Sequence, residues 1–202
     1  MLNVKQTKTG IYYIHDYYPS RYKNLSEEQE EDRRFIWNLK DLKDDAVSRS
    51  ANELIKTIRS ICKDVDIPRV GLVAVPPSKV NKESPVRKSI RLLYSWYEDG
   101  IIKNFFGFDK IICDYSNLLT RIIDIPTSHE GTRATYRQQM ESMVCNKNLL
   151  SMSPTIFFLI DDITTSGTTM RACMNILAKN VRETDIIICF ALARTVPDGV
   201  GQ

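Results

Sequence analysis

Two acidic residues followed by a run of hydroxyl side chains form the stretch of this sequence best suited to chemistry. Asp161 and Asp162 come directly after an apolar run at residues 155–160, and five Thr or Ser residues then surround Gly167. Carboxylates accept hydrogen bonds from sugar hydroxyls or bind Mg²⁺. Small hydroxyl side chains beside a glycine leave backbone N–H groups open to an anion. The two groups together suit a sugar phosphate.

The phosphate of such a ligand is expected at the turn after the apolar run. Ligands of open parallel sheets bind beyond the carboxyl ends of the strands, and this turn leads into a predicted helix at residues 168–181. A helix N-terminus offers unpaired N–H groups and a favourable dipole. The sequence therefore predicts ribose binding by Asp161 and Asp162, and phosphate binding by Thr164, Thr165, Ser166, Gly167, Thr168 and Thr169.

Other interpretations of this stretch were weighed against its spacing. The simplest alternative is that the turn only caps a helix and that the two aspartates are ordinary turn residues. A Walker P-loop requires GxxxxGK[ST], which the chain lacks. A DxDxT phosphatase motif fails as well, because Ile163 stands two positions after Asp161 and Thr164 two positions after Asp162. The sugar-phosphate interpretation fits all the residues of the stretch.

The elements that must position these residues alternate between strand and helix patterns. Short apolar runs typical of buried parallel strands lie at residues 70–75, 110–114, 155–160 and 185–193. Helical periodicity marks residues 44–62 and 84–104, whereas residues 116–150 have no clear period. Such alternation predicts an α/β fold with a doubly wound, mainly parallel sheet flanked by helices.

The first 43 residues have a different character. Residues 10–18 are β-branched and aromatic, which predicts a strand or hairpin arm. Ser26 followed by Gln29 predicts a capping box that opens an acidic helix. We expect one domain over residues 1–202, with residues 1–43 as a small N-terminal hood or elaboration and residues 44–202 as the α/β core.

Composition narrows the class of protein. The chain has 202 residues, 43% apolar and 26% charged, with a net charge of +3. The mild positive charge favours anionic ligands and supports nucleic-acid binding only weakly. Five separated cysteines without a CxxC pair indicate reduced thiols. No apolar run reaches the length of a membrane span and no signal peptide precedes the first strand, so we expect a cytoplasmic protein.

The run FFLIDDITTSGTT at residues 157–169 resembles the signature of type I phosphoribosyltransferases. Within that superfamily the chain is most similar to the competence-associated ComF-like proteins. Three further stretches carry the resemblance: VAVP at residues 73–76, LTR at residues 119–121 with a basic segment at residues 131–138, and FALART at residues 190–195. The resemblance implies the type I phosphoribosyltransferase fold and covers residues 70–195.

The resemblance also implies roles. Asp161 and Asp162 would bind the ribose 2′- and 3′-hydroxyls, with Mg²⁺ held indirectly through ligand or water. Arg133 and Arg137 fall where the family has a mobile catalytic loop. The diphosphate would be held by Val75, Pro76, Pro77, Ser78 and Lys79.

The departures from the family concern the acceptor. Thr165 stands where purine-salvage members have an Asp near the base, and residues 81–84 (NKES) replace the Arg-Gly-Phe-Asn-like run of ComF-like proteins. Three functions therefore stay open. The chain is a phosphoribosyltransferase for an unidentified nitrogenous acceptor, a non-catalytic sensor of phosphoribosyl diphosphate or a nucleotide monophosphate, or an effector in DNA uptake or anti-phage defence. Homo-oligomerisation stays open too.

Overall fold

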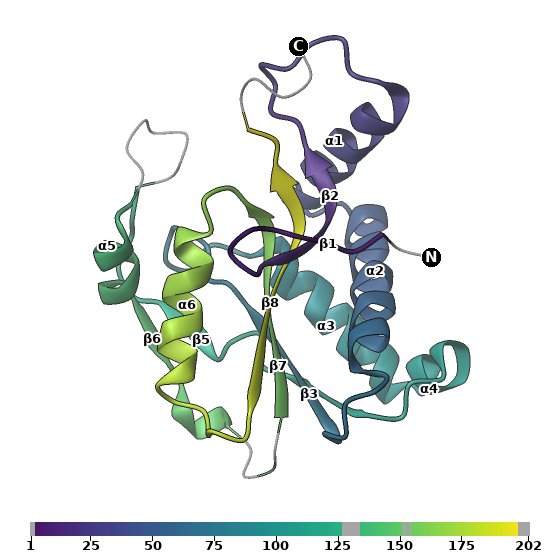
Figure 1. Ribbon diagram of the computed structural model, residues 1–202, viewed down its shortest axis with the longest axis vertical. Helices are drawn as coiled ribbons and strands as arrows, with labels where there is room; N and C mark the ends of the chain where they lie inside the picture. The colour runs from purple at the N-terminus through teal and green to yellow at the C-terminus, as the bar shows by residue number, and fades with distance from the viewer. Residues whose placement is uncertain (1–2, 127–133, 151–152, 154, 198–202) are drawn as a thin grey trace.

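The computed structural model describes residues 3–126, 134–150, 153 and 155–197. Its centre is a six-stranded sheet of strand order β1-β2-β8-β7-β3-β4, in which only the β1–β2 pair is antiparallel. The predicted α/β fold with a mainly parallel sheet is confirmed (Figure 1). The strands are β1 (Lys5–Gln6), β2 (Tyr12–Tyr17), β3 (Arg69–Ala74), β4 (Ile111–Asp114), β7 (Thr155–Thr164) and β8 (Ile186–Thr195).

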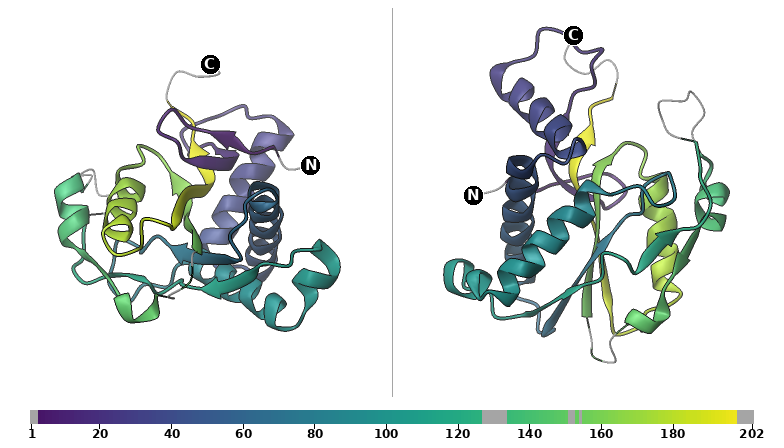
Figure 2. Two further views of the ribbon diagram at one scale, coloured as in Figure 1. Left: turned by 60° about the horizontal axis from the view of Figure 1, so that its bottom comes forward. Right: turned by 180° about the vertical axis from the view of Figure 1, so that it is seen from behind.

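Helices cover both faces of this sheet because its strands are apolar on both sides. Alternate residues of β7 belong to two separate cores, with Phe158 in one and Phe157 in the other. The first core is closed by α1 (Glu27–Lys40), α2 (Asp44–Cys62), α3 (Pro85–Glu98) and α4 (Ile101–Phe106). The second is closed by α6 (Thr168–Ala178) and by the segment around the β5–β6 pair. Figure 2 (left) shows α6 and α2 on opposite sides of the strands.

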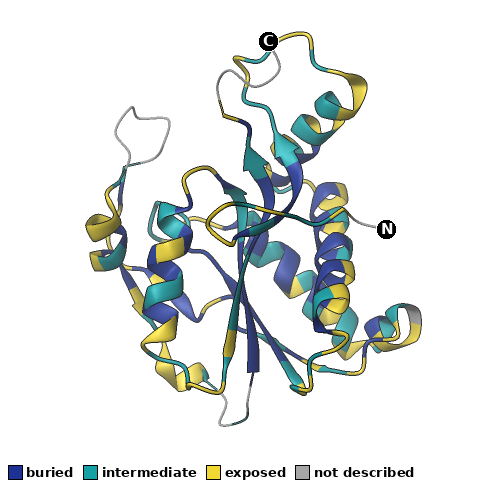
Figure 3. Ribbon diagram, viewed as in Figure 1, coloured by how far each residue is buried: buried dark blue, intermediate teal, exposed yellow. Residues whose placement is uncertain are grey.

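A smaller layer fills the region that the sequence left unassigned. Here β5 (Leu119–Arg121) and β6 (Met143–Cys145) pair antiparallel, with α5 (Tyr136–Glu141) between them and a short 3-10 turn, η1 (Lys147–Leu149), after them. Burial follows the two cores, with dark-blue strands in the centre and exposed outer faces on the helices (Figure 3). Among the described residues, none of the helices combines the length and apolar character that a bilayer span requires.

Most predicted elements are confirmed, and two boundaries were wrong. The capping box is present, since Ser26 Oγ accepts from Gln29 N at 3.3 Å and Gln29 Oε1 accepts from Ser26 N at 2.9 Å. The single helix predicted at residues 84–104 is two helices, because Gly100 adopts φ 73° and ends the first. Strand β7 also continues beyond residue 160 to Thr164, because β8 pairs with it as far as Arg194.

The N-terminal residues belong to two layers. Strand β2 lies inside the central sheet, parallel to β8, with Tyr17 opposite Thr195. Helix α1 lies beyond this strand and forms the hood-like part of the chain (Figure 1).

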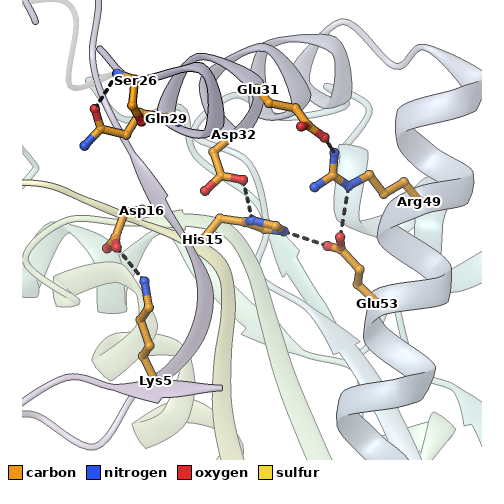
Figure 4. Close-up of polar contacts among 9 residues, drawn as sticks. All are labelled: Lys5, His15, Asp16, Ser26, Gln29, Glu31, Asp32, Arg49 and Glu53. Carbon is orange, nitrogen blue, oxygen red and sulfur yellow. Dashed lines mark hydrogen bonds and ion pairs between the residues drawn. The ribbon is translucent and has the colours of Figure 1, made fainter. Parts of the chain in front are cut away.

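A buried histidine joins the N-terminal layers to the core. His15 on β2 contacts Asp32 on α1 through Nδ1 at 2.8 Å and Glu53 on α2 through Nε2 at 2.9 Å (Figure 4). Burial disfavours the charged imidazole, but the hydrogen bonds with the two carboxylates outweigh it and raise the pKa of His15 to about 9. A protonated His15 therefore holds two helices against one strand at neutral pH.

Candidate functional site

The strand order reverses between β3 and β7. From β3 the chain proceeds outward to the edge strand β4, and it then returns to the other side of β3 to form β7 and β8. In open parallel sheets such a reversal opens a crevice beyond the carboxyl ends of the two strands. The crevice here has a volume of about 880 Å³, and its lining includes residues from the loop after β3 and from the end of β7.

Asp161 and Asp162 lie in the part of β7 that extends past β3. The β3–β7 ladder ends with Ala74 opposite Ile160 and one more bond from Val75 N to Ile160 O, whereas β8 continues to pair with β7. One edge of the last four β7 residues is therefore open to the crevice. The side chains of adjacent strand residues leave the backbone on opposite faces of the sheet. Both carboxylates nevertheless line the crevice.

The two carboxyl groups interact with each other. Burial raises the pKa of Asp161 well above its ordinary value, and the neighbouring Asp162 carboxylate raises it further by repulsion and hydrogen bonding. Each carboxyl also accepts from the next backbone N–H, Asp161 Oδ1 from Asp162 N at 2.9 Å and Asp162 Oδ1 from Ile163 N at 2.8 Å. Binding of hydroxyl donors or of a cation would stabilise such a carboxyl pair.

The turn after β7 forms a recess of about 140 Å³ whose lining shares residues with that of the crevice, Asp161 among them. Gly167 is the N-cap of α6 and adopts φ 72°, a conformation that favours glycine. A Cβ at this position would lie 2.8 Å from Ile11 Cδ1, so the glycine also lets the N-terminal segment approach closely. The recess is lined by all of the predicted phosphate-binding residues: Thr164, Thr165, Ser166, Gly167, Thr168 and Thr169.

Hydroxyl groups of the turn are fixed by neighbouring hydroxyls. Ser166 Oγ lies 3.0 Å from Thr168 Oγ1, and Thr165 Oγ1 lies 3.0 Å from Thr195 Oγ1 at the end of β8. A hydroxyl paired with another hydroxyl can still donate or accept toward a ligand. The turn thus presents hydroxyls and the α6 N-terminus to the same recess.

The loop after β3 is held by a buried arginine. Arg121 on β5 is 4% exposed, and its Nε donates to Pro77 O at 2.8 Å while Nη2 donates to Pro76 O at 3.3 Å. Its remaining hydrogen bonds reach Gln139 Oε1 at 3.2 Å and Ser142 Oγ at 2.5 Å. Arg121 also lines the crevice and is close enough to Asp161 for their charges to interact. It is a cation beneath the candidate diphosphate loop.

The predicted diphosphate-binding residues divide into two groups. Val75, Pro76, Pro77 and Ser78 line the crevice, whereas Lys79 is half-buried and is not part of its lining. The loop continues into Val80, whose N–H donates to Asp124 Oδ1 at 2.7 Å. The residues at the start of the loop, and not Lys79, line the crevice.

Of the two predicted catalytic arginines, the structure describes Arg137. Arg133 lies outside the described residues. Arg137 is exposed on α5, where Nε donates to Glu141 Oε1 at 2.7 Å, and it does not line either cavity. Their catalytic role stays a prediction.

A magnesium ion fits the chemistry of the acidic pair but not a site built from protein alone. The described residues contain no group of three or more His, Cys, Asp or Glu side chains that could hold a metal. Two carboxylates that repel one another, in a crevice, are oxygen donors of the kind Mg²⁺ prefers. Asp161 and Asp162 can hold such an ion only together with oxygens of a ligand or water.

Sequence reasoning missed cationic residues that line the crevice, among them Arg121, Lys40 at the end of α1, and Arg194 on β8. Arg121 was noticed only as part of a resembling stretch. No sequence pattern indicated Lys40, because its position at the crevice depends on how α1 packs over the sheet. Arg194 was also noticed only within a resembling stretch. It lies at the carboxyl end of β8 and could have been found by the argument that located Asp161.

Comparison with known proteins gives matches at the level of structure only. No protein-family model and no curated protein sequence matches the chain. Among solved structures, the chain is similar to a hypoxanthine phosphoribosyltransferase from Staphylococcus aureus in two crystal forms. The tetragonal form is 14% identical in sequence, with a TM-score of 0.34, and the match covers 81% of this chain and 75% of that one. The orthorhombic form is 13% identical, with a TM-score of 0.31, and the match covers 81% of this chain and 76% of that one. The chemistry assigned to this chain therefore depends on its own crevice.

Proposed function

We propose that the chain binds phosphoribosyl diphosphate in this crevice and transfers the 5-phosphoribosyl group to a nitrogenous acceptor, releasing diphosphate. One observation carries the proposal. A carboxylate pair and a hydroxyl-rich turn at a helix N-terminus line two cavities with shared lining residues, at the point where the strand order reverses. A sugar diol and a phosphate on the same molecule match these two groups.

Each part of the ligand would contact a different group of the crevice. The 5′-phosphate would lie in the recess formed by the turn after β7, bound by N–H groups and hydroxyls. The ribose 2′- and 3′-hydroxyls would donate to Asp161 and Asp162. The diphosphate would lie against the loop at Val75, Pro76, Pro77 and Ser78, above the Arg121 guanidinium.

The reaction would be a displacement at C1 of the ribose. The acceptor nitrogen gives its lone pair to C1, the C1–O bond breaks with its electrons on the diphosphate, and the N–H proton passes to water. The positive charge of Arg121 beneath the loop would stabilise the leaving group. Bound Mg²⁺ would supply charge neutralisation for the diphosphate, with Asp161 and Asp162 helping to hold it.

Four stretches that resemble ComF-like proteins support the finer assignment to that group. Each contributes to the crevice lining: Val75 and Pro76 from the first, Arg121 from the second, Asp161 from the signature, and Arg194 from the last. The small positive charge and the reduced thiols fit a cytoplasmic setting, which we include in the proposal.

A sensor of phosphoribosyl diphosphate or of a nucleotide monophosphate is the second candidate function. Thr165 stands where purine-salvage members have an acid, and its hydroxyl oxygen lies 3.0 Å from that of Thr195. Arg137 is paired with Glu141 away from the cavities. Both observations favour binding without an efficient proton-transfer step.

Calorimetric titration with phosphoribosyl diphosphate and Mg²⁺ tests the proposal. We expect binding to the wild-type chain and a loss of at least about tenfold in affinity for Asp161→Asn with Asp162→Asn, because each hydrogen bond to a charged group contributes about 1.5–3 kcal/mol. The control is Asp66→Asn, an exposed acid that lines neither cavity. Unchanged affinity in the double variant would remove the ribose role. Diphosphate release in the presence of an acceptor separates transferase from sensor.

A further inference from the structure

The wall of the crevice opposite the diphosphate loop is cationic. Strand order places β7 in the middle, with β3 on one side and β8 followed by β2 on the other. The β3 side contributes the loop at Val75–Ser78, whereas the other side contributes Tyr17, Lys40, Arg194 and Thr195 to the lining. The acidic pair lies between the two sides.

Lys40 and Arg194 have their charges available for a ligand. Lys40 Nζ lies 5.5 Å from the centroid of the Tyr17 ring, and its charge also interacts with the Asp161 carboxyl, whereas the guanidinium carbon of Arg194 lies 5.8 Å from the centroid of the Tyr13 ring. Neither has a carboxylate partner at ion-pair distance within the part of the chain that the structure describes. By contrast, Arg49 and Lys88 are each paired with a carboxylate.

The position of this wall suits the incoming acceptor. A displacement at C1 brings the nucleophile from the side opposite the leaving group. With the ribose over Asp161 and Asp162 and the diphosphate on the β3 side, the acceptor approaches from the side of β8 and β2. The Tyr17 ring, fixed by Trp37 Nε1 donating to its hydroxyl at 3.1 Å, gives this side a flat surface suited to a ring.

We propose that Lys40 and Arg194 form an anion subsite, so that the acceptor is a nitrogenous compound carrying a carboxylate or phosphate group. Two cations without a carboxylate at ion-pair distance in the described part of the chain would gain a charge-assisted contact with such a group. This inference rests on the proposed function, since it concerns the second substrate of the same crevice. A neutral ring would leave both charges unmatched.

The test uses pairs of probes that differ in one carboxylate: nicotinate with nicotinamide, orotate with uracil, and anthranilate with aniline. Binding of each probe is measured calorimetrically on the full chain saturated with ribose 5-phosphate and Mg²⁺. We expect at least one acid to bind about tenfold more tightly than its neutral partner. Inorganic phosphate added as a competitor should displace that acid. Equal binding, or no binding, in every pair would overturn the inference.

Variants of the two cations test whether this wall of the crevice causes the preference for the acid. Lys40→Gln with Arg194→Gln should abolish the preference for the acid, while Lys56→Gln on the exposed face of α2 should preserve it. The same variants are titrated with phosphoribosyl diphosphate. If its affinity falls about tenfold as well, the wall binds the diphosphate and the inference is wrong. If the wild-type chain fails to bind phosphoribosyl diphosphate at all, the proposed function fails, which is a separate result.

Discussion

Arg121 Nε donates a hydrogen bond to Pro77 O over 2.8 Å, which attaches the loop after β3 to the small β5–β6 layer. The same guanidinium reaches Gln139 and Ser142, so a single side chain connects three segments. Proline carbonyls in a loop have no strand partner of their own here, and the arginine supplies one. The shape of the candidate diphosphate site therefore depends on a residue from another layer.

Arg121→Met is expected to lower the free energy of unfolding by about 2–4 kcal/mol, because it leaves buried acceptors without donors. Chemical denaturation measures the change. Arg137→Met is the control, since Arg137 is exposed and should leave the midpoint unchanged. Arg121→Lys should regain part of the stability but not the affinity for phosphoribosyl diphosphate, because an ammonium with three N–H donors cannot keep the contacts with both proline carbonyls, Gln139 and Ser142 together. Full recovery of affinity would contradict the positioning role.

Asp161→Asn should raise the thermal midpoint at pH 7. The folded-state pKa of Asp161 is raised by burial and by Asp162, so the ionised carboxylate destabilises the folded chain at neutral pH. The folded state holds more protons above the unfolded pKa, and stability therefore falls as the pH rises from about 4. The gain in midpoint from the variant should shrink on acidification and be lost near pH 4. A lower midpoint at pH 7 would contradict the repulsion.

Stability should also fall as the pH rises through about 9. Below pH 6.5 His15 is protonated in both states and its stabilising contribution is complete; between 6.5 and about 9 only the folded state keeps the proton. The contribution lost is up to about 3 kcal/mol, at 1.36 kcal/mol per pKa unit. Denaturation of wild type and His15→Gln at pH 6, 7.5 and 9.5 measures it. The variant should be less stable at pH 6 and have a flatter profile, and parallel profiles would disprove the role of His15.

Gly167→Ala and Gly10→Ala form a matched pair. Both glycines have positive φ, 72° and 82°, so each alanine costs about 1–2 kcal/mol in backbone conformation. Only at Gly167 does the added Cβ meet a neighbour, Ile11 Cδ1 at 2.8 Å, whereas nothing lies within 4 Å at Gly10. Gly167→Ala should be the more destabilising and should weaken binding of phosphoribosyl diphosphate. Equal effects on unfolding and binding would show that the close approach to Ile11 is unimportant.

The sequence predicted the elements whose signals are local. The apolar runs located the buried parallel strands, Ser26 and Gln29 located the start of α1, and residues 157–169 located the candidate turn and acids. Gly100 was overlooked as a helix end, because the apolar period continues across it. The end of β7 was set by its neighbour β8, which no local pattern records.

The candidate site was predicted where one segment supplies it. Asp161 and the turn after it are consecutive in the chain, so their spacing alone indicated a ligand. Arg121, Lys40 and Arg194 come from three other elements, and only the folded arrangement brings them to the crevice. A charged residue on a single loop or helix end does not indicate a ligand site until the residues that fold next to it are known.

The parallel pairing of β2 with β8 has a consequence for how the chain acquires its shape. Tyr13 lies opposite Ala191, so β2 cannot form this pairing before β8 has left the ribosome. Contacts so distant in sequence are slow to form. We expect the nascent chain to keep this edge of the aromatic strand unpaired and exposed to chaperones until β8 has been synthesised.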